Sequence, residues 1–169
     1  MKLKPIVLAF ASLMLACGLD QNSYKFESGT YGVSGATLAS STDQCGFLGA
    51  YTNSSKVIGV ASSGTTVTFN LANDPTLTSD QKPTATLDSN VLTTLAEANY
   101  TVDYKDNSGV TYCVVRVHTG VGGDVTADNT AALKVSINAT TESGTCSGNN
   151  TDFAAVPCNS MYDFTAKMK

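Results

Sequence analysis

Alternation of apolar and polar residues recurs through this chain and limits what it can fold into. In the segment 133–139 every second residue is apolar, and the segments 100–105 and 111–119 follow the same rule on either side of the turn sequence 106–109. Residues two apart share one face of a β-strand, so each segment is expected to form a half-buried strand. The segment 100–119 is therefore predicted to be a hairpin.

Shorter segments carry the same signal. Turn residues divide them, and the glycines of 120–123 are predicted to end the strand that precedes them. The predicted strands are 24–33 with an interruption at Ser28-Gly29, 57–61 paired with 66–71, a brief one at 84–87, and a last one that follows Pro157-Cys158 and places Tyr162, Phe164, Ala166 and Met168 on one face.

The segment 89–98 departs from this pattern. Val91, Leu92, Leu95 and Ala98 lie at helical spacing, and Ser89 is a residue type that caps helix N-termini. We therefore expect one short helix of two to three turns here, covering an open side of the sheet.

Seven or eight strands joined by short turns predict an all-β fold, a single antiparallel meander. A parallel sheet would need a helix between each pair of successive strands, and the sequence does not show such alternation. A small barrel is favoured over a sandwich, because consecutive hairpins need no long crossover and the last strand can pair with the first, which removes both edges.

The first sixteen residues have the parts of an export signal. Lys2 and Lys4 supply the charged start, and an apolar run follows at 6–15. That run has about ten residues, whereas a membrane-spanning helix needs about twenty. The segment 1–16 is therefore predicted to be a cleaved signal peptide.

A single cysteine follows directly after that signal. Met14, Leu15, Ala16 and Cys17 resemble the lipobox of bacterial lipoproteins. The resemblance implies that Cys17 becomes the mature N-terminus and carries fatty acyl chains, such as palmitate, on its sulfur and amine. Gly18 in the next position resembles lipoproteins sorted to the outer membrane. The alternative is an ordinary secreted protein whose Cys17 is incidental.

Five cysteines are an odd number for an exported chain, and lipidation of Cys17 would leave an even set: Cys45, Cys113, Cys146 and Cys158. An oxidising compartment would pair these in two disulfides. Three pairings exist, and we favour Cys146 with Cys158, which leaves Cys45 with Cys113. Zinc is the competing use of four cysteines, but no Cys-x-x-Cys pair is present, so no metal site is predicted.

The predicted organisation is a signal peptide at 1–16, a lipidated cysteine and polar tether at 17–23, and one β-domain at 24–169. Without the signal, eight basic residues face fourteen acidic ones, for a net charge of −6. No basic stripe remains for a nucleic acid partner.

Few residues suggest chemistry. His118 is the single histidine and shares a predicted strand face with Tyr112, Val114 and Arg116. No Gly-x-Ser-x-Gly nucleophile motif accompanies it, so no catalytic residue and no cofactor are predicted.

Two pairs of carboxylates, Asp103 with Asp106 and Asp124 with Asp128, flank predicted turns. Turn chemistry accounts for them. Weak calcium binding at 106–109 is the alternative, although its spacing does not follow the EF-hand pattern.

These observations lead us to expect a non-enzymatic bacterial envelope lipoprotein. It is held to the membrane, the outer membrane being favoured, through Cys17, and its β-domain binds an unidentified protein or small molecule or serves a surface role. The globular part resembles, in general pattern, the many small lipoproteins with paired cysteines found in bacterial genomes, and this likeness carries no activity with it. One alternative is a lipocalin-like carrier of a small apolar ligand, with a pocket of several hundred cubic ångströms. Another is an inhibitor of an envelope-targeting enzyme.

Overall fold

The computed structural model describes residues 23–39, 43–147 and 151–169, and in these residues the protein is all-β. One antiparallel sheet holds nine strands, one or two more than the sequence predicts. A five-residue helix α1 (Leu48–Thr52) and one 3-10 turn (Ser79–Gln81) accompany them. The strands are β1 (Gly29–Leu38), β2 (Val57–Ser63), β3 (Thr66–Asn70), β4 (Thr84–Asp88), β5 (Val91–Ala96), β6 (Ala98–Lys105), β7 (Thr111–Ala127), β8 (Thr130–Gly144) and β9 (Cys158–Met168).

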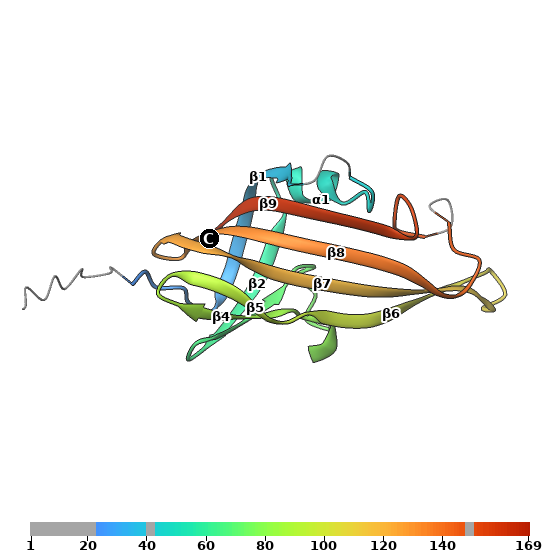
Figure 1. Cartoon of the computed structure of the whole chain (residues 1–169), viewed down its shortest axis with the longest axis horizontal. Helices are drawn as coiled ribbons and strands as arrows, with labels where there is room; N and C mark the ends of the chain where they lie inside the picture. Colours follow the sequence, from blue (N-terminus) through green and yellow to red (C-terminus); the bar gives the residue numbers. More distant parts are fainter. Residues whose placement is uncertain (1–22, 40–42, 148–150) are drawn as a thin grey trace, which may run out of the picture.

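The sheet closes into a ring, as the sequence predicts. The strand order is β5-β4-β3-β2-β1-β9-β8-β7-β6, and β5 also pairs with β7. The first and last strands pair, with Tyr31 opposite Met168, so β1 and β9 lie side by side in the wall. Strands β6 to β9 run side by side along the long axis, and β1 and β2 cross behind them (Figure 1). The ring thus has eight strands, and β6 lies outside it along β7.

Strand β7 continues through the glycines that were predicted to end it. Gly123 has a φ of +139°, and a Cβ placed there would lie 2.1 Å from the Ala132 carbonyl oxygen. Leu92 of β5 pairs with Gly123, and the Thr94 hydroxyl donates a hydrogen bond to the Val121 carbonyl at 2.8 Å. The glycines therefore mark where β7 changes partner from β6 to β5, because a residue without a side chain permits the sharp bend.

The predicted helix at 89–98 is wrong. Ser89 and Asn90 have φ values of 48° and 75°, which suit a two-residue hairpin turn and not a helix start. The chain reverses at this turn, and β5 pairs with β4. Val91 and Leu95 are 47% and 59% exposed, so their helical spacing does not describe a buried face.

The middle of the barrel is filled by side chains at alternate positions. In β8 the buried residues are Ala131, Leu133, Val135, Ile137 and Ala139, in agreement with the predicted alternation. Tyr31, Phe69 and Tyr162 are fully buried aromatic residues that meet these strands in the core. An eight-stranded barrel has room for little more than such side chains.

One end of the barrel is closed by the segment 24–28, which precedes β1. The predicted first strand began at Tyr24, but the structure starts β1 only at Gly29. The ring of Phe26 is 4% exposed and lies 4.9 Å, between centroids, from the ring of Tyr31 and 6.4 Å from that of Phe69. Phe26 thus fills the open end of the core.

Side chains from the turns hold this segment in place of a strand partner. The Tyr24 amide donates to Asn90 Oδ1 at 2.7 Å, the Lys25 amide to Asp128 Oδ1 at 2.9 Å, and the Glu27 amide to Asn129 Oδ1 at 2.8 Å. Since these amides bond to side chains, the segment is not a ladder strand. We call this closed end, with the turns at 64–65, 89–90 and 128–129, the hairpin end.

Two disulfides form, as predicted, but the favoured pairing is wrong. Cys45 bonds Cys158, and Cys113 bonds Cys146, each with 5.2 Å between the Cα atoms. Cys113 of β7 pairs with Gly144, the last residue of β8. Cys146 follows two residues later and therefore lies beside Cys113. The Cys45 amide donates to the Ser160 hydroxyl of β9 at 3.0 Å, which places Cys45 near Cys158. Proximity along the sequence is therefore less important than sheet register. Cys17 lies outside the described residues.

Replacing Phe26 with alanine is expected to lower the free energy of unfolding by about 3–5 kcal/mol, because it removes a buried ring and leaves a cavity at the hairpin end. Tyr24→Ala is the control, since that side chain is 38% exposed, and it is expected to change stability by less than about 1 kcal/mol. Urea denaturation of the mature protein measures both. Equal losses in the two variants would show that Phe26 does not seal the core.

Candidate functional site

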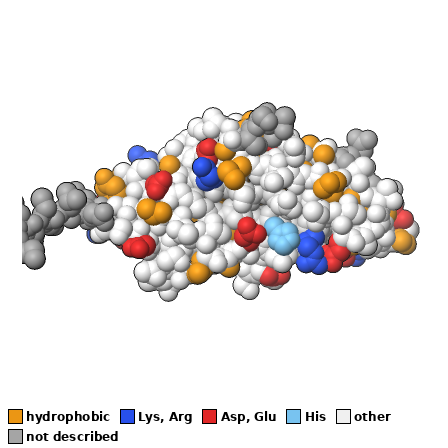
Figure 2. Space-filling model, in the orientation of Figure 1, with side chains coloured by type: hydrophobic (Ala, Val, Ile, Leu, Met, Phe, Trp, Pro, Cys, Tyr) orange, Lys and Arg blue, Asp and Glu red, His pale blue; other side chains and the backbone are white. Residues whose placement is uncertain are grey.

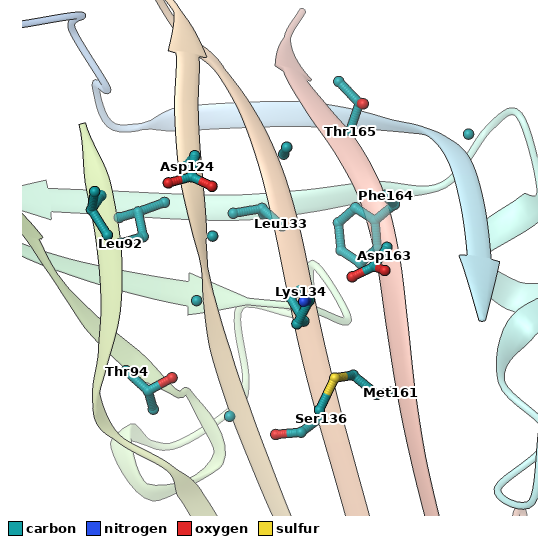
Figure 3. Close-up of a pocket in the computed structure, with 16 residues that line it drawn as sticks. Leu92, Thr94, Asp124, Leu133, Lys134, Ser136, Met161, Asp163, Phe164 and Thr165 are labelled. Atoms are coloured by element: carbon teal, nitrogen blue, oxygen red, sulfur yellow. The ribbon is translucent and has the colours of Figure 1, made fainter. Parts of the chain in front are cut away.

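The outer wall of the barrel carries a broad trough of about 680 Å³. It lies across β5, β7, β8 and β9 (Figure 3). Gly120 and Gly122 form part of its floor; a Cβ on Gly120 would lie 2.8 Å from Ser136 Oγ, and one on Gly122 would lie 3.0 Å from the Leu92 carbonyl oxygen. The glycines that allow the barrel to close therefore also hollow its outer face.

Charged side chains surround this floor. Asp124, Lys134 and Asp163 line the trough from three neighbouring strands (Figure 3). Lys134 stands opposite Asp163 in the ladder, yet within the described part of the chain neither makes an ion pair within 4 Å. These groups are thus solvated and accessible to a partner.

A second hollow, of about 190 Å³, lies at the opposite end of the barrel from Phe26. We call it the mouth pocket. Helix α1 and the loop 71–83 cover it, and its wall comes from β6, β7 and β8. Its lining residues are largely apolar: Phe47, Ala50, Tyr51, Lys56, Leu71, Ala72, Leu77, Gln81, Pro83, Tyr100, Val117, Thr119, Ile137 and Phe153.

Tyr51 is the central aromatic residue of the mouth pocket. Its ring stacks on Phe164 at 5.1 Å between centroids and lies 5.3 Å from the Tyr162 ring. Burial raises the pKa of the Tyr51 hydroxyl above its ordinary value, and burial likewise raises the pKa of Tyr100. Both phenols are therefore neutral at physiological pH.

Lys56 stands at the edge of the same pocket. Its Nζ lies 5.6 Å from the centre of the Tyr51 ring, within range of a cation–π interaction. Burial lowers the pKa of Lys56 because desolvation disfavours the charged amine.

Asp43 holds the loop that carries α1, and the sequence reasoning missed it. Its carboxylate accepts hydrogen bonds from the amides of Gly46 at 2.8 Å, Phe47 at 3.2 Å and Leu48 at 2.9 Å. The Tyr162 hydroxyl, which comes from β9, donates to the same carboxylate at 2.5 Å. An aspartate three residues before a glycine is a weak local sign of such a turn, but the partner on β9 is 119 residues away.

Hydrogen bonding sets the charge of Asp43. Desolvation raises the pKa of this carboxyl, but the bonds from Tyr162 and from the three backbone amides outweigh it, so the pKa lies below its ordinary value of 3.8. The carboxylate form is therefore the one that holds the loop.

His118 lies on the outer wall with Arg116, as the alternation predicts. Its Nδ1 is 3.9 Å from Glu97 Oε2, and the neighbouring Arg116 pairs with Glu142 at 2.5 Å. Figure 2 shows the chain's histidine exposed on the surface between acidic and basic side chains. Among the described residues, no serine, threonine or cysteine side chain is hydrogen-bonded to it.

The predicted aspartate pairs are not brought together into one site. Asp106 bonds its own turn, accepting from the Ser108 hydroxyl at 2.6 Å and the Val110 amide at 3.0 Å, and the Ser108 bond is the main cause that lowers the pKa of Asp106. Asp128 binds the segment 24–28, while Asp124 lines the trough. In the parts of the chain that the structure describes, no three His, Cys, Asp or Glu side chains are grouped as metal ligands.

Comparisons of the chain with protein-family models, with curated proteins and with solved structures give no match. Within the described ranges, the helices are too short and too polar to cross a membrane.

The Asp43 contacts predict a pH dependence of stability. Because the pKa of Asp43 is lowered on folding, its contribution to stability is fully present above its ordinary pKa of 3.8 and is lost as the pH falls through the lowered pKa of the folded state. In urea denaturation across this range, the Asp43→Asn variant is expected to lose less stability than the unsubstituted protein.

Asp163→Asn is the matched control, since no hydrogen bond to a described residue holds that trough carboxylate. A stability difference between the Asp43→Asn variant and the unsubstituted protein that stays constant from pH 7 to pH 2.5 would contradict the assignment.

Proposed function

We propose that this protein is a non-catalytic binding domain held at the bacterial envelope membrane by lipid on Cys17, with the outer membrane favoured. The observation that carries the proposal is the path of the chain: Tyr24, seven residues after Cys17, already bonds the turn at Asn90. Seven residues span at most about 24 Å. An anchored chain therefore brings the hairpin end close to the membrane.

This path also orients the domain. The hairpin end is sealed by Phe26, whereas the mouth pocket lies at the other end and the trough lies on the side wall. An anchor at Cys17 leaves both hollows exposed to the aqueous side. Three acyl chains, or two, give stable membrane attachment, whereas one chain gives only reversible binding.

The trough supports binding of a macromolecule. It is open, and it presents two carboxylates and one ammonium with no ion pair to other described residues, over a floor of glycine backbone. Such a surface suits a protein partner that supplies charges of both signs. An inhibitor of an envelope-targeting enzyme is one form that this binding takes. His118 is not among the residues that line either hollow, so it gives no support to a catalytic role there.

The mouth pocket favours a second candidate function, the carriage of a small ligand. Its volume of about 190 Å³ is smaller than the several hundred cubic ångströms expected of a lipocalin-like carrier. A ligand of this size has one ring or a short chain and not a long lipid tail.

The anchor is tested by replacing Cys17. In cells grown with labelled palmitate, the Cys17→Ala variant is expected to lose the label and to move from the membrane fraction to the soluble fraction. Met14→Leu, which brings the lipobox closer to its usual form, is the control that retains both. Retention of the label by the Cys17→Ala variant, or a mature N-terminus at another residue by mass spectrometry, would sink the proposal.

Binding at the trough is tested by a photo-crosslinking amino acid. Placed at Met161, a trough residue that is 36% exposed, it is expected to give a discrete crosslinked species in intact cells. Placed at Ala61, an exposed residue of β2 across the ring from β7, it is expected to give none. The same adducts from both positions, or none from Met161, would argue against the trough as a binding surface.

A further inference from the structure

We infer that the mouth pocket binds a small carboxylate whose apolar body is about the size of one aromatic ring. An apolar cavity of about 150 Å³ accommodates a benzene molecule, and the mouth pocket has about 190 Å³. The additional space suits a short polar group attached to such a body. The inference rests on the proposed binding function and is independent of the lipid anchor.

Buried hydroxyls without partners are the first argument. Tyr51 and Thr119 are each 6% exposed and both line the pocket, yet the hydroxyl of neither is hydrogen-bonded to any described residue. No fully enclosed side-chain oxygen among the described residues lacks a partner, so these two hydroxyls keep some accessible surface, and the residues that carry them line the pocket. The Tyr100 hydroxyl, also in the lining, has no partner among the described residues either.

Hydroxyls of this kind require a partner. A buried hydroxyl that is left without one costs about 1–3 kcal/mol, and a water molecule or a ligand oxygen removes that cost. The three residues that carry these donors line one small volume from α1, β6 and β7. They therefore favour a ligand that carries oxygen acceptors.

Charge selects the kind of acceptor. Of the described residues that line the pocket, Lys56 is the only charged one. No ion pair within 4 Å joins it to another described residue. Asp43, which holds the loop before α1, is turned to the backbone of that loop and to Tyr162. An anion in the pocket thus meets an ammonium and no competing carboxylate.

Small rim residues give the ligand a way in. Ala50 of α1 and Ala72 of the loop 71–83 are exposed and lie at the edge of the pocket. The apolar body then rests among Val117, Ile137 and Phe153, and the carboxylate points to Lys56 at the edge.

The test uses phenylacetate and its neutral isostere phenylacetamide, titrated calorimetrically into the full mature protein. We expect phenylacetate to bind at least tenfold more tightly than phenylacetamide. The Lys56→Gln variant is expected to lose this preference, while Lys105→Gln, at an exposed site on β6, is expected to keep it.

Two further variants separate the pocket from general folding. Tyr51→Phe keeps the ring and removes only the hydroxyl, and it is expected to weaken phenylacetate binding about tenfold with no loss of thermal stability. Ala50→Trp is expected to block the pocket from its rim and abolish binding while the protein stays folded.

Several results would overturn the inference: no binding of phenylacetate or hexanoate at millimolar concentration, equal affinity for phenylacetate and phenylacetamide, or unchanged binding in the Ala50→Trp variant. Failure of the anchor is a separate result. If phenylacetate binds as expected to a protein that fractionates as soluble, the pocket inference stands and the anchor proposal falls.

Discussion

The rest of the structure depends on the change of partner within β7. Its first half pairs with β6, and from Gly123 it pairs with β5, which closes the ring. A side chain at Gly123 would collide with the Ala132 carbonyl, so a larger residue would open the barrel there. The same glycines leave the outer wall hollow, because Gly120 and Gly122 face outward without side chains. Closure and the trough thus have one physical cause.

The two barrel ends differ because different interactions close them. At the hairpin end, Phe26 fills the core and turn side chains bind the backbone of the segment 24–28. At the other end α1 and the loop 71–83 form the cover instead of a single side chain, and the Asp43 carboxylate and the Cys45–Cys158 disulfide fix the loop before α1 to β9. A cover made of several loops leaves gaps, and the mouth pocket is one of them. The proposed anchor at Cys17 would make this end the distal one.

The sequence predicted the alternating strands and the barrel well, because period-two burial is a local property that strands β6 to β9 display clearly. Prediction from the sequence failed where contacts between residues far apart in the chain determine the local structure. The glycines at 120–123 look like a break until β5 is placed beside them, and the helical spacing at 91–98 is overridden by a two-residue turn with positive φ. Disulfide pairing failed for the same reason, since Cys113 and Cys146 meet only through the β7–β8 register.

The mouth pocket was beyond prediction for a further reason, which bears on what it does. Tyr51 lies in α1, Tyr100 in β6 and Thr119 in β7. In the sequence, each residue type is accounted for by its own helix or strand, so nothing groups the three into one site. Phenylalanine at 51 and valine at 119 would fill the same volume without the cost of an unpaired buried hydroxyl, about 1–3 kcal/mol for each when nothing replaces water. A pocket assembled for packing alone would favour those apolar residues. Hydroxyl-bearing residues that line one pocket with a lysine that has no ion pair among the described residues are instead an arrangement that would stabilise an anionic oxygen.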